Sequence, residues 1–245
     1  MNIARYNAAA SSWNSIGGDT MVESPNIIAS RQMRGFWRDG LSTNPASGSW
    51  DWSVDSNQIA MLIKARDRGA NHLELFSNSP MWWMCENLNT SGADDGAADN
   101  LNPAYYDEHA IYLATVAKYA QDNWGITFDS VSPFNEPDAD WWRADGTQEG
   151  CHFDPATQET VISLLRDELD NQNLTSTIVA ASDESLYDTA RATWNSFSAS
   201  TPGKDRPGER PWLPGYRGSA GLALPGCETA GSFGTPSMVT TTAAA

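Results

Sequence analysis

A glutamate followed by proline lies directly after a predicted strand, in the segment SPFNEP at residues 132–137. In β/α barrels the carboxyl ends of the strands carry the catalytic groups. A carboxylic acid held there can protonate the leaving oxygen of a glycosidic bond, and a neighbouring polar group can hydrogen-bond the 2-hydroxyl of the sugar. Glu136 is therefore a candidate acid/base and Asn135 its candidate partner. The alternative is an exposed loop glutamate without a chemical role.

Tryptophans lie near this segment in unusual number, since the chain has 11 of them. An indole ring offers a large flat face on which a sugar ring can stack. Trp141 and Trp142 follow Glu136, while Trp82 and Trp83 follow the preceding predicted strand, close to Asn78. We expect these residues to bind substrate, although neighbouring side chains in an extended segment point opposite ways, so that one of Trp82 and Trp83 packs inward.

Other reactive side chains also follow predicted strands. Arg5 ends the first strand, where a cation can orient a carboxylate and keep it ionised; the alternative is a surface arginine. Asp183 and Glu184 follow the last strand and offer either a second carboxylate or an acidic start to the next helix. Cys85 and Cys151 lie in loops expected to be neighbours, which predicts either a disulfide or two free thiols.

The histidines and cysteines show no metal-ligand spacing. His72, His109 and His152 are scattered, and Cys227 has no obvious partner. We therefore expect structural histidines, no metal and no cofactor.

Helical and strand patterns alternate between residues 53 and 197. The patterns predict strands at 2–6, 71–76, 127–134 and 177–181, and helices at 54–68, 102–125, from 154 onward and at 187–197. Asn102 with Pro103 and Asp154 with Pro155 are pairs typical of helix starts. Repeated β-α alternation predicts parallel strands joined by crossover helices. The expected fold class is α/β, with about half of a (β/α)8 barrel.

Composition narrows the classes of partner. The 245 residues suit one large domain, and 31 acidic against 15 basic residues give a net charge of −16. Nucleic acid and anionic membranes are bound through Lys and Arg, so both are disfavoured as partners. No apolar stretch is long enough to cross a membrane, and the first residues do not resemble a signal peptide.

Residues 198–245 differ from the rest of the chain. From residue 201 onward they contain six Pro and eight Gly. A frameshift, a mis-predicted exon or a native linker would each produce this composition, and we expect an irregular, poorly ordered tail. The predicted domain is therefore residues 1–197.

Five segments together resemble fungal endo-β-1,6-galactanases of glycoside hydrolase family 30: NIARYN at 2–7, SWDWS at 49–53, FSNSPMWWM at 76–84, PFNEP at 133–137 and DGTQEGC at 145–151. The resemblance covers residues 1–197. It implies a secreted, monomeric enzyme that cuts β-1,6-galactan side chains with retention of configuration. By this resemblance Glu136 is the acid/base, Asn135 binds the 2-hydroxyl, and Arg5 is the active-site arginine of the second barrel strand.

The resemblance ends near Phe197, after about the fifth barrel strand. The family carries its nucleophilic glutamate on the seventh strand, and no later residue of this sequence matches it. Because a retaining mechanism needs two carboxyl groups, we predict negligible hydrolase activity unless Asp183 or Glu184 is a substitute. The alternatives are a non-catalytic carbohydrate-binding paralogue and a glycosidase for another linkage, such as β-1,6-glucan or xylan.

Overall fold

A parallel four-stranded sheet forms the centre of the molecule. The computed structural model describes residues 2–12, 15–16, 19–20, 26–27 and 29–201, so the predicted tail beyond residue 201, with Cys227, lies outside the described residues. The strand order is β1-β4-β5-β6, formed by β1 (Ile3–Asn7), β4 (His72–Phe76), β5 (Ser130–Ser132) and β6 (Ile178–Val179). All three strand pairs are parallel, which confirms the predicted α/β class.

Two of the predicted strands are shorter in the structure than the sequence indicated. β5 ends at Ser132, and the following Pro133 has no N–H to continue the hydrogen-bond ladder. β6 covers only two residues, although the Ala180 N–H still donates to the Val131 carbonyl at 2.9 Å. A small antiparallel pair, β2 (Ser15–Ile16) with β3 (Asp19–Thr20), was not predicted.

Helices connect the strands and start where the capping residues indicated. The α-helices are α1 (Ser56–Asp67), α2 (Tyr106–Tyr119), α3 (Pro155–Asn171) and α4 (Tyr187–Ser196). Short 3-10 turns cover η1 (Ala29–Arg31), η2 (Trp82–Met84) and η3 (Pro103–Tyr105), and a π-helical turn, η4 (Ala120–Trp124), extends α2. The side chain of Asn102 accepts the Ala104 N–H at 2.8 Å, so the predicted cap is present.

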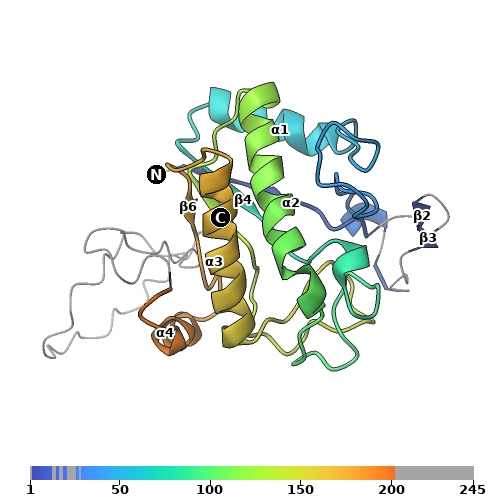
Figure 1. The fold of residues 1–245 in the computed structure, drawn as a ribbon, viewed down its shortest axis with the longest axis vertical. Coiled ribbons are helices and arrows are strands. Elements are labelled where there is room, and N and C mark those ends of the chain that lie inside the picture. Colours follow the sequence, from blue (N-terminus) through green and yellow to red (C-terminus); the bar gives the residue numbers. More distant parts are fainter. Residues whose placement is uncertain (1, 13–14, 17–18, 21–25, 28, 202–245) are drawn as a thin grey trace, which may run out of the picture.

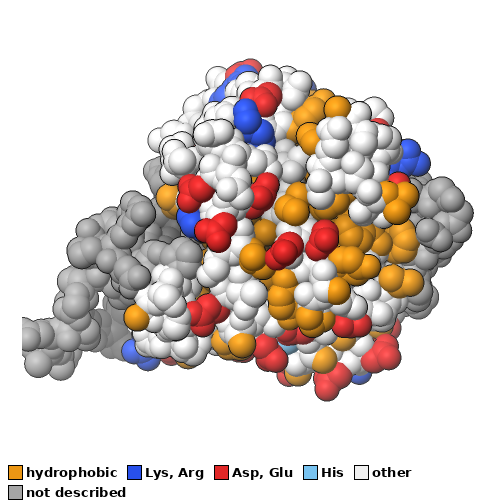
Figure 2. Space-filling model, viewed as in Figure 1, with side chains coloured by type: hydrophobic (Ala, Val, Ile, Leu, Met, Phe, Trp, Pro, Cys, Tyr) orange, Lys and Arg blue, Asp and Glu red, His pale blue; other side chains and the backbone are white. Residues whose placement is uncertain are grey.

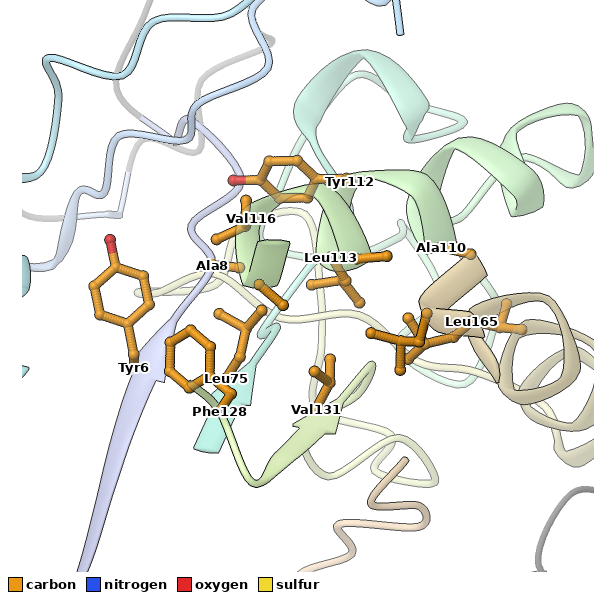
Figure 3. Close-up of a cluster of buried hydrophobic side chains, with 14 of the residues drawn as sticks. Tyr6, Ala8, Leu75, Ala110, Tyr112, Leu113, Val116, Phe128, Val131 and Leu165 are labelled. Atoms are coloured by element: carbon orange, nitrogen blue, oxygen red, sulfur yellow. The ribbon is translucent and has the colours of Figure 1, made fainter. Parts of the chain in front are cut away.

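The core lies between the sheet and the helices α2 and α3, which run side by side (Figure 1). In the close-up, Leu75 and Val131 from the strands point toward Leu113 and Val116 of α2 and toward Leu165 of α3 (Figure 3). Each of these five side chains is fully buried. Side chains alternate along a strand, so the strand residues on either side of Leu75 and Val131 face the opposite side of the sheet, where the candidate site lies.

The helical face of the molecule has acidic side chains spread over it, and hydrophobic side chains gather beside them (Figure 2). None of the helices within the described residues is long and apolar enough to cross a lipid bilayer.

Candidate active site

Glu136 lies four residues after β5 in an unusual backbone conformation. Its φ of 50° falls in the left-handed region, which residues other than glycine rarely adopt. Its N–H donates to the Asp183 carbonyl at 2.7 Å, and its own carbonyl accepts the Ala139 N–H at 3.1 Å. The same carbonyl accepts the indole N–H of Trp142 at 2.9 Å. Strained residues held in this way are common at functional sites, and the three bonds fix where the carboxyl group begins.

A pocket of about 310 Å³ opens beside Glu136. Its lining consists of Glu136, Trp141, Trp142, Gly146, Thr147 and Gln148. The two tryptophans have different roles here. Trp141 is 51% exposed and offers a ring to a ligand, whereas Trp142 is 5% exposed and holds the Glu136 backbone. The structure thus brings both predicted residues to Glu136, but only Trp141 has an open ring.

Gly150 leaves room for the indole ring of Trp142. A Cβ atom added at Gly150 would lie 2.0 Å from the Trp142 ring, well inside van der Waals contact. Only a residue without a side chain therefore allows the indole to reach the Glu136 carbonyl.

Arg5 joins two carboxylates on the face of the sheet opposite the helices. Its Nε donates to Glu74 Oε1 at 2.6 Å, and its Nη2 forms an ion pair with Asp183. The guanidinium carbon lies 4.0 Å from the ring centroid of Phe76, in cation–π geometry. The other oxygen of Glu74 accepts the Ser130 hydroxyl at 2.9 Å. Arg5 is therefore a paired cation that can orient carboxylates, although the residue itself is exposed.

Asp183 and Glu184 are both 5% exposed and lie beside the Glu136 segment. Burial raises the pKa of Asp183 to about 6, and the charges of Glu74 and Glu136 add to this while Arg5 opposes it. Burial also raises the pKa of Glu184 to about 7. Neither residue starts a helix, since α4 begins at Tyr187, so that alternative is wrong.

Trp82 and Trp83 differ in exposure. Trp82 is 5% exposed and packs inward, as expected of one of the pair. Trp83 is partly exposed; it meets Trp37 edge-on, with ring centroids 5.1 Å apart, and donates its indole N–H to the Trp37 carbonyl at 3.1 Å. The aromatic contact with Trp37 therefore holds the ring that remains partly open. Asn78, in the same loop, and Asn135, beside Glu136, are partly exposed.

Cys85 and Cys151 are buried free thiols, so the predicted disulfide is absent and the alternative holds. Their loops are neighbours, as expected, because Cys85 forms a β-bridge with Leu101, and Asp99, two residues before Leu101, forms one with His152. Burial raises the pKa of Cys151 well above its ordinary value. Burial raises the pKa of Cys85 to about 12. Each thiol donates to a backbone carbonyl, Cys85 to Met81 at 3.6 Å and Cys151 to His152 at 3.2 Å. Buried, neutral thiols of this kind are unreactive.

Glu149 lies in the segment 145–151 but was not predicted as a site residue from the sequence. It is 2% exposed, and its Oε1 accepts the backbone N–H groups of Ala10 at 3.0 Å and Ser12 at 3.4 Å. Its other oxygen lies 3.5 Å from Asn7 Nδ2. Glu149 thereby ties the pocket-lining loop to the loop after β1. Glu74 was also missed, although its polar side chain between two leucines of a strand indicated a polar sheet face.

Comparison with known proteins identifies the family. Residues 11–199 match O-Glycosyl hydrolase family 30. An endo-beta-1,6-galactanase of Hypocrea rufa is 58% identical over 200 residues, which are 82% of this chain and 41% of that enzyme. The chain belongs to glycoside hydrolase family 30. It spans less than half the length of this relative.

Solved structures agree on the fold of the family 30 chain. A conserved exported protein from Bacteroides fragilis superposes with a TM-score of 0.59 at 22% identity, over 76% of this chain and 34% of that one. The catalytic domain of GH30 xylanase C from Talaromyces cellulolyticus gives a TM-score of 0.56 at 22% identity, over 82% and 41% of the two chains. These likenesses concern the fold alone, and they are consistent with a partial barrel.

The contact between Gly150 and Trp142 can be tested by replacement. We expect Gly150→Ala to destabilise the family 30 chain by about 1–3 kcal/mol, because the methyl group overpacks the Trp142 ring. Urea unfolding measures the change. Gly48→Ala is the matched control, since a Cβ there meets nothing within 4 Å. Equal effects of the two replacements would contradict the proposed packing.

Burial of Glu149 predicts a dependence of stability on pH. Burial raises its pKa from an ordinary 4.5 to about 7, against the hydrogen bonds from Ser12, Ala10 and Asn7, which lower it. The folded chain therefore keeps a proton that the unfolded chain has released. The contribution to stability is complete below about pH 4.5 and is lost as pH rises through about 7, by roughly 3 kcal/mol at 1.36 kcal/mol per pKa unit.

Urea unfolding at pH 4.5 and pH 8 measures this slope. Glu149→Gln should flatten it, whereas Glu86→Gln, at an exposed position, should leave it unchanged. Asp183 and Glu184 shift in the same direction, so a residual slope of the same sign remains in the Glu149→Gln variant. An unchanged slope in that variant would show that Glu149 is ionised in the folded chain.

Proposed function

We propose that this chain carries the acid/base half of a retaining endo-β-1,6-galactanase, with Glu136 as the acid/base. The supporting observation is the placement of Glu136 at the carboxyl end of β5, on the wall of a pocket that also holds an exposed tryptophan. The 58% identity to the endo-beta-1,6-galactanase of Hypocrea rufa favours β-1,6-galactan as the substrate. A polymeric substrate favours action outside the cell.

Glu136 acts on the oxygen that links two sugars. In its protonated form it donates a proton to the leaving oxygen, and in its ionised form it then accepts a proton from the attacking water. Asn135 precedes it in the chain and hydrogen-bonds the sugar 2-hydroxyl. Trp141 stacks on a sugar ring at the pocket entrance, which places the scissile bond against the carboxyl group.

A retaining reaction also needs an ionised nucleophile about 5–5.5 Å from the acid/base. Among the described residues, the buried carboxyl groups next to the Glu136 segment are already engaged. Asp183 is paired with Arg5, and Glu184 accepts the Asp138 N–H at 3.1 Å and the Thr193 hydroxyl at 3.4 Å. Burial raises the pKa of both groups, to about 6 and about 7, which favours the neutral acid over the ionised form that a nucleophile needs. We therefore propose that these 245 residues taken alone bind galactan and turn it over negligibly.

Turnover is measured as release of reducing sugar from β-1,6-galactan. The chain alone should give background release. Mixed with the separately produced part of the Hypocrea rufa enzyme that this chain does not match, it should give galactanase activity that Glu136→Gln abolishes. Activity that survives in the Glu136→Gln mixture would refute the acid/base role. Activity of the chain alone that Asp183→Asn removes would identify Asp183 as a substitute nucleophile.

Substrate preference is measured by calorimetric titration of the chain with β-1,6-galacto-, β-1,6-gluco- and xylo-oligosaccharides. We expect the galacto-oligosaccharide to bind tightest, and Trp141→Ala to weaken that binding at least several-fold because the stacking face is removed. Tyr187→Ala is the matched control, since Tyr187 is 50% exposed and lies on α4, away from the pocket lining. Tighter binding of a gluco- or xylo-oligosaccharide would favour another linkage specificity.

A further inference from the structure

Asp99, His152 and Asp154 bring three metal-ligating side chains together at the edge of the candidate active site. One ligand atom from each lies within 4.8 Å of the others. His152 Nε2 is 3.4 Å from Asp154 Oδ1 and 3.9 Å from Asp99 Oδ1. Asp99 belongs to the loop between β4 and α2, whereas His152 and Asp154 belong to the loop that carries Glu136. The cluster therefore joins two loops that are remote in sequence, which is why ligand spacing alone did not predict it.

The second ring nitrogen of His152 fixes how the first one faces the carboxylates. Nδ1 lies 3.3 Å from the carbonyl oxygen of Ala139. A carbonyl only accepts hydrogen bonds, so this contact places a proton on Nδ1. In the neutral ring Nε2 is then an acceptor that faces two further acceptors, on a residue that is 5% exposed. Asp99 Oδ1 also accepts the Asp154 backbone N–H at 2.6 Å, so the cluster is held together at one side. A buried ring acceptor that faces two carboxylates is favourable only with a cation between them, which is a second ring proton or a metal ion.

Asp154 supplies an independent observation. It is the N-cap residue of α3, a position at which an aspartate side chain normally accepts a backbone N–H of the first turn. Here its side chain makes no capping hydrogen bond and is directed to His152 instead. The side chain is 69% exposed, so an ion can reach the cluster directly from solvent.

We propose that Asp99, His152 and Asp154 bind one divalent transition-metal ion of the Zn²⁺ type. One imidazole nitrogen with two carboxylates suits Zn²⁺ or Mn²⁺, whereas Ca²⁺ and Mg²⁺ prefer oxygen ligands throughout. The Nδ1–H bond to a carbonyl is the usual way in which a metal-bound histidine is oriented.

The bound ion is a clamp on the segment that carries Glu136. The Ala139 carbonyl accepts from His152, and the Ala139 N–H donates to the Glu136 carbonyl at 3.1 Å. An ion that fixes the His152 ring therefore also fixes the turn after Glu136. This metal site is independent of the sugar specificity proposed above, because its ligands do not line the pocket.

The test uses the full chain stripped of metal with a chelator. Calorimetric titration with Zn²⁺ should give one ion per chain, and Co²⁺ should produce visible absorption bands typical of a nitrogen- and oxygen-ligated site. Zn²⁺ should also raise the thermal unfolding midpoint. Asp154→Asn should weaken Zn²⁺ binding at least tenfold. Asp188→Asn, an exposed aspartate in the first turn of α4, should leave it unchanged.

Two results would overturn the metal site. One is the absence of stoichiometric binding by the unaltered chain, with an unfolding midpoint that does not respond to Zn²⁺. The other is equal Zn²⁺ affinity in the unaltered, Asp154→Asn and His152→Gln chains, which would place the ion elsewhere. Neither readout involves sugar, so failure here leaves the proposed galactanase function untouched.

Discussion

The ion pairs of Arg5 set the shape on which the candidate site depends. Arg5 lies on the first strand of the sheet, and Asp183 follows the fourth. Neighbouring strands are about 4.8 Å apart, so a flat sheet would separate its first and fourth strands by about 14 Å. A direct ion pair between them agrees with a sheet that curls, as in the wall of a barrel. The carbonyl of Asp183 also accepts the N–H of Glu136, so the residue that pairs with Arg5 also positions Glu136.

This arrangement is an unfavourable way to gain stability. One cation is shared by two carboxylates, and Glu74 and Asp183 are 1% and 5% exposed. Removing such charges from water often offsets their mutual attraction. The raised pKa of Asp183, which comes from burial and from Glu74 and Glu136, shows that the attraction of Arg5 does not compensate fully. The main effect of the network is to orient side chains on the polar face of the sheet, rather than to stabilise the fold.

Features that depend on neighbouring residues in the sequence could be predicted. Asn102 with Pro103 begins the α2 region, and Gly125, with a φ of 62°, ends it, because capping is local chemistry. The position of Glu136 after a strand was also predicted, because it follows from the order of residues within one segment. The ends of β5 and β6 were not, since strand length depends on which backbone groups a distant partner offers.

Features that depend on contacts between loops could not be predicted. Glu149 is significant only because the loop after β1 presents two N–H groups to it. Trp83 contacts Trp37, which lies 46 residues earlier in the chain, and this contact sets the orientation of its ring. The loops of Cys85 and Cys151 are neighbours, yet each thiol is free and donates to a nearby carbonyl. The order of the strands predicts which loops are neighbours, but it does not predict where a side chain in a loop points.

The sheet alone does not determine what the pocket accepts. Chains of 22% identity share this fold, so the fold alone does not set which residues line the pocket wall. In this chain the wall is held at two points. Trp142 donates to the Glu136 carbonyl and packs against Gly150, and Glu149 accepts a backbone N–H from the loop after β1. Thr147 and Gln148 lie in the sequence between Trp142 and Glu149, and both line the pocket. Because the ends of this segment are fixed by buried groups, its middle can change residue type without moving Glu136, so the pocket lining can vary while the proposed acid/base stays in place.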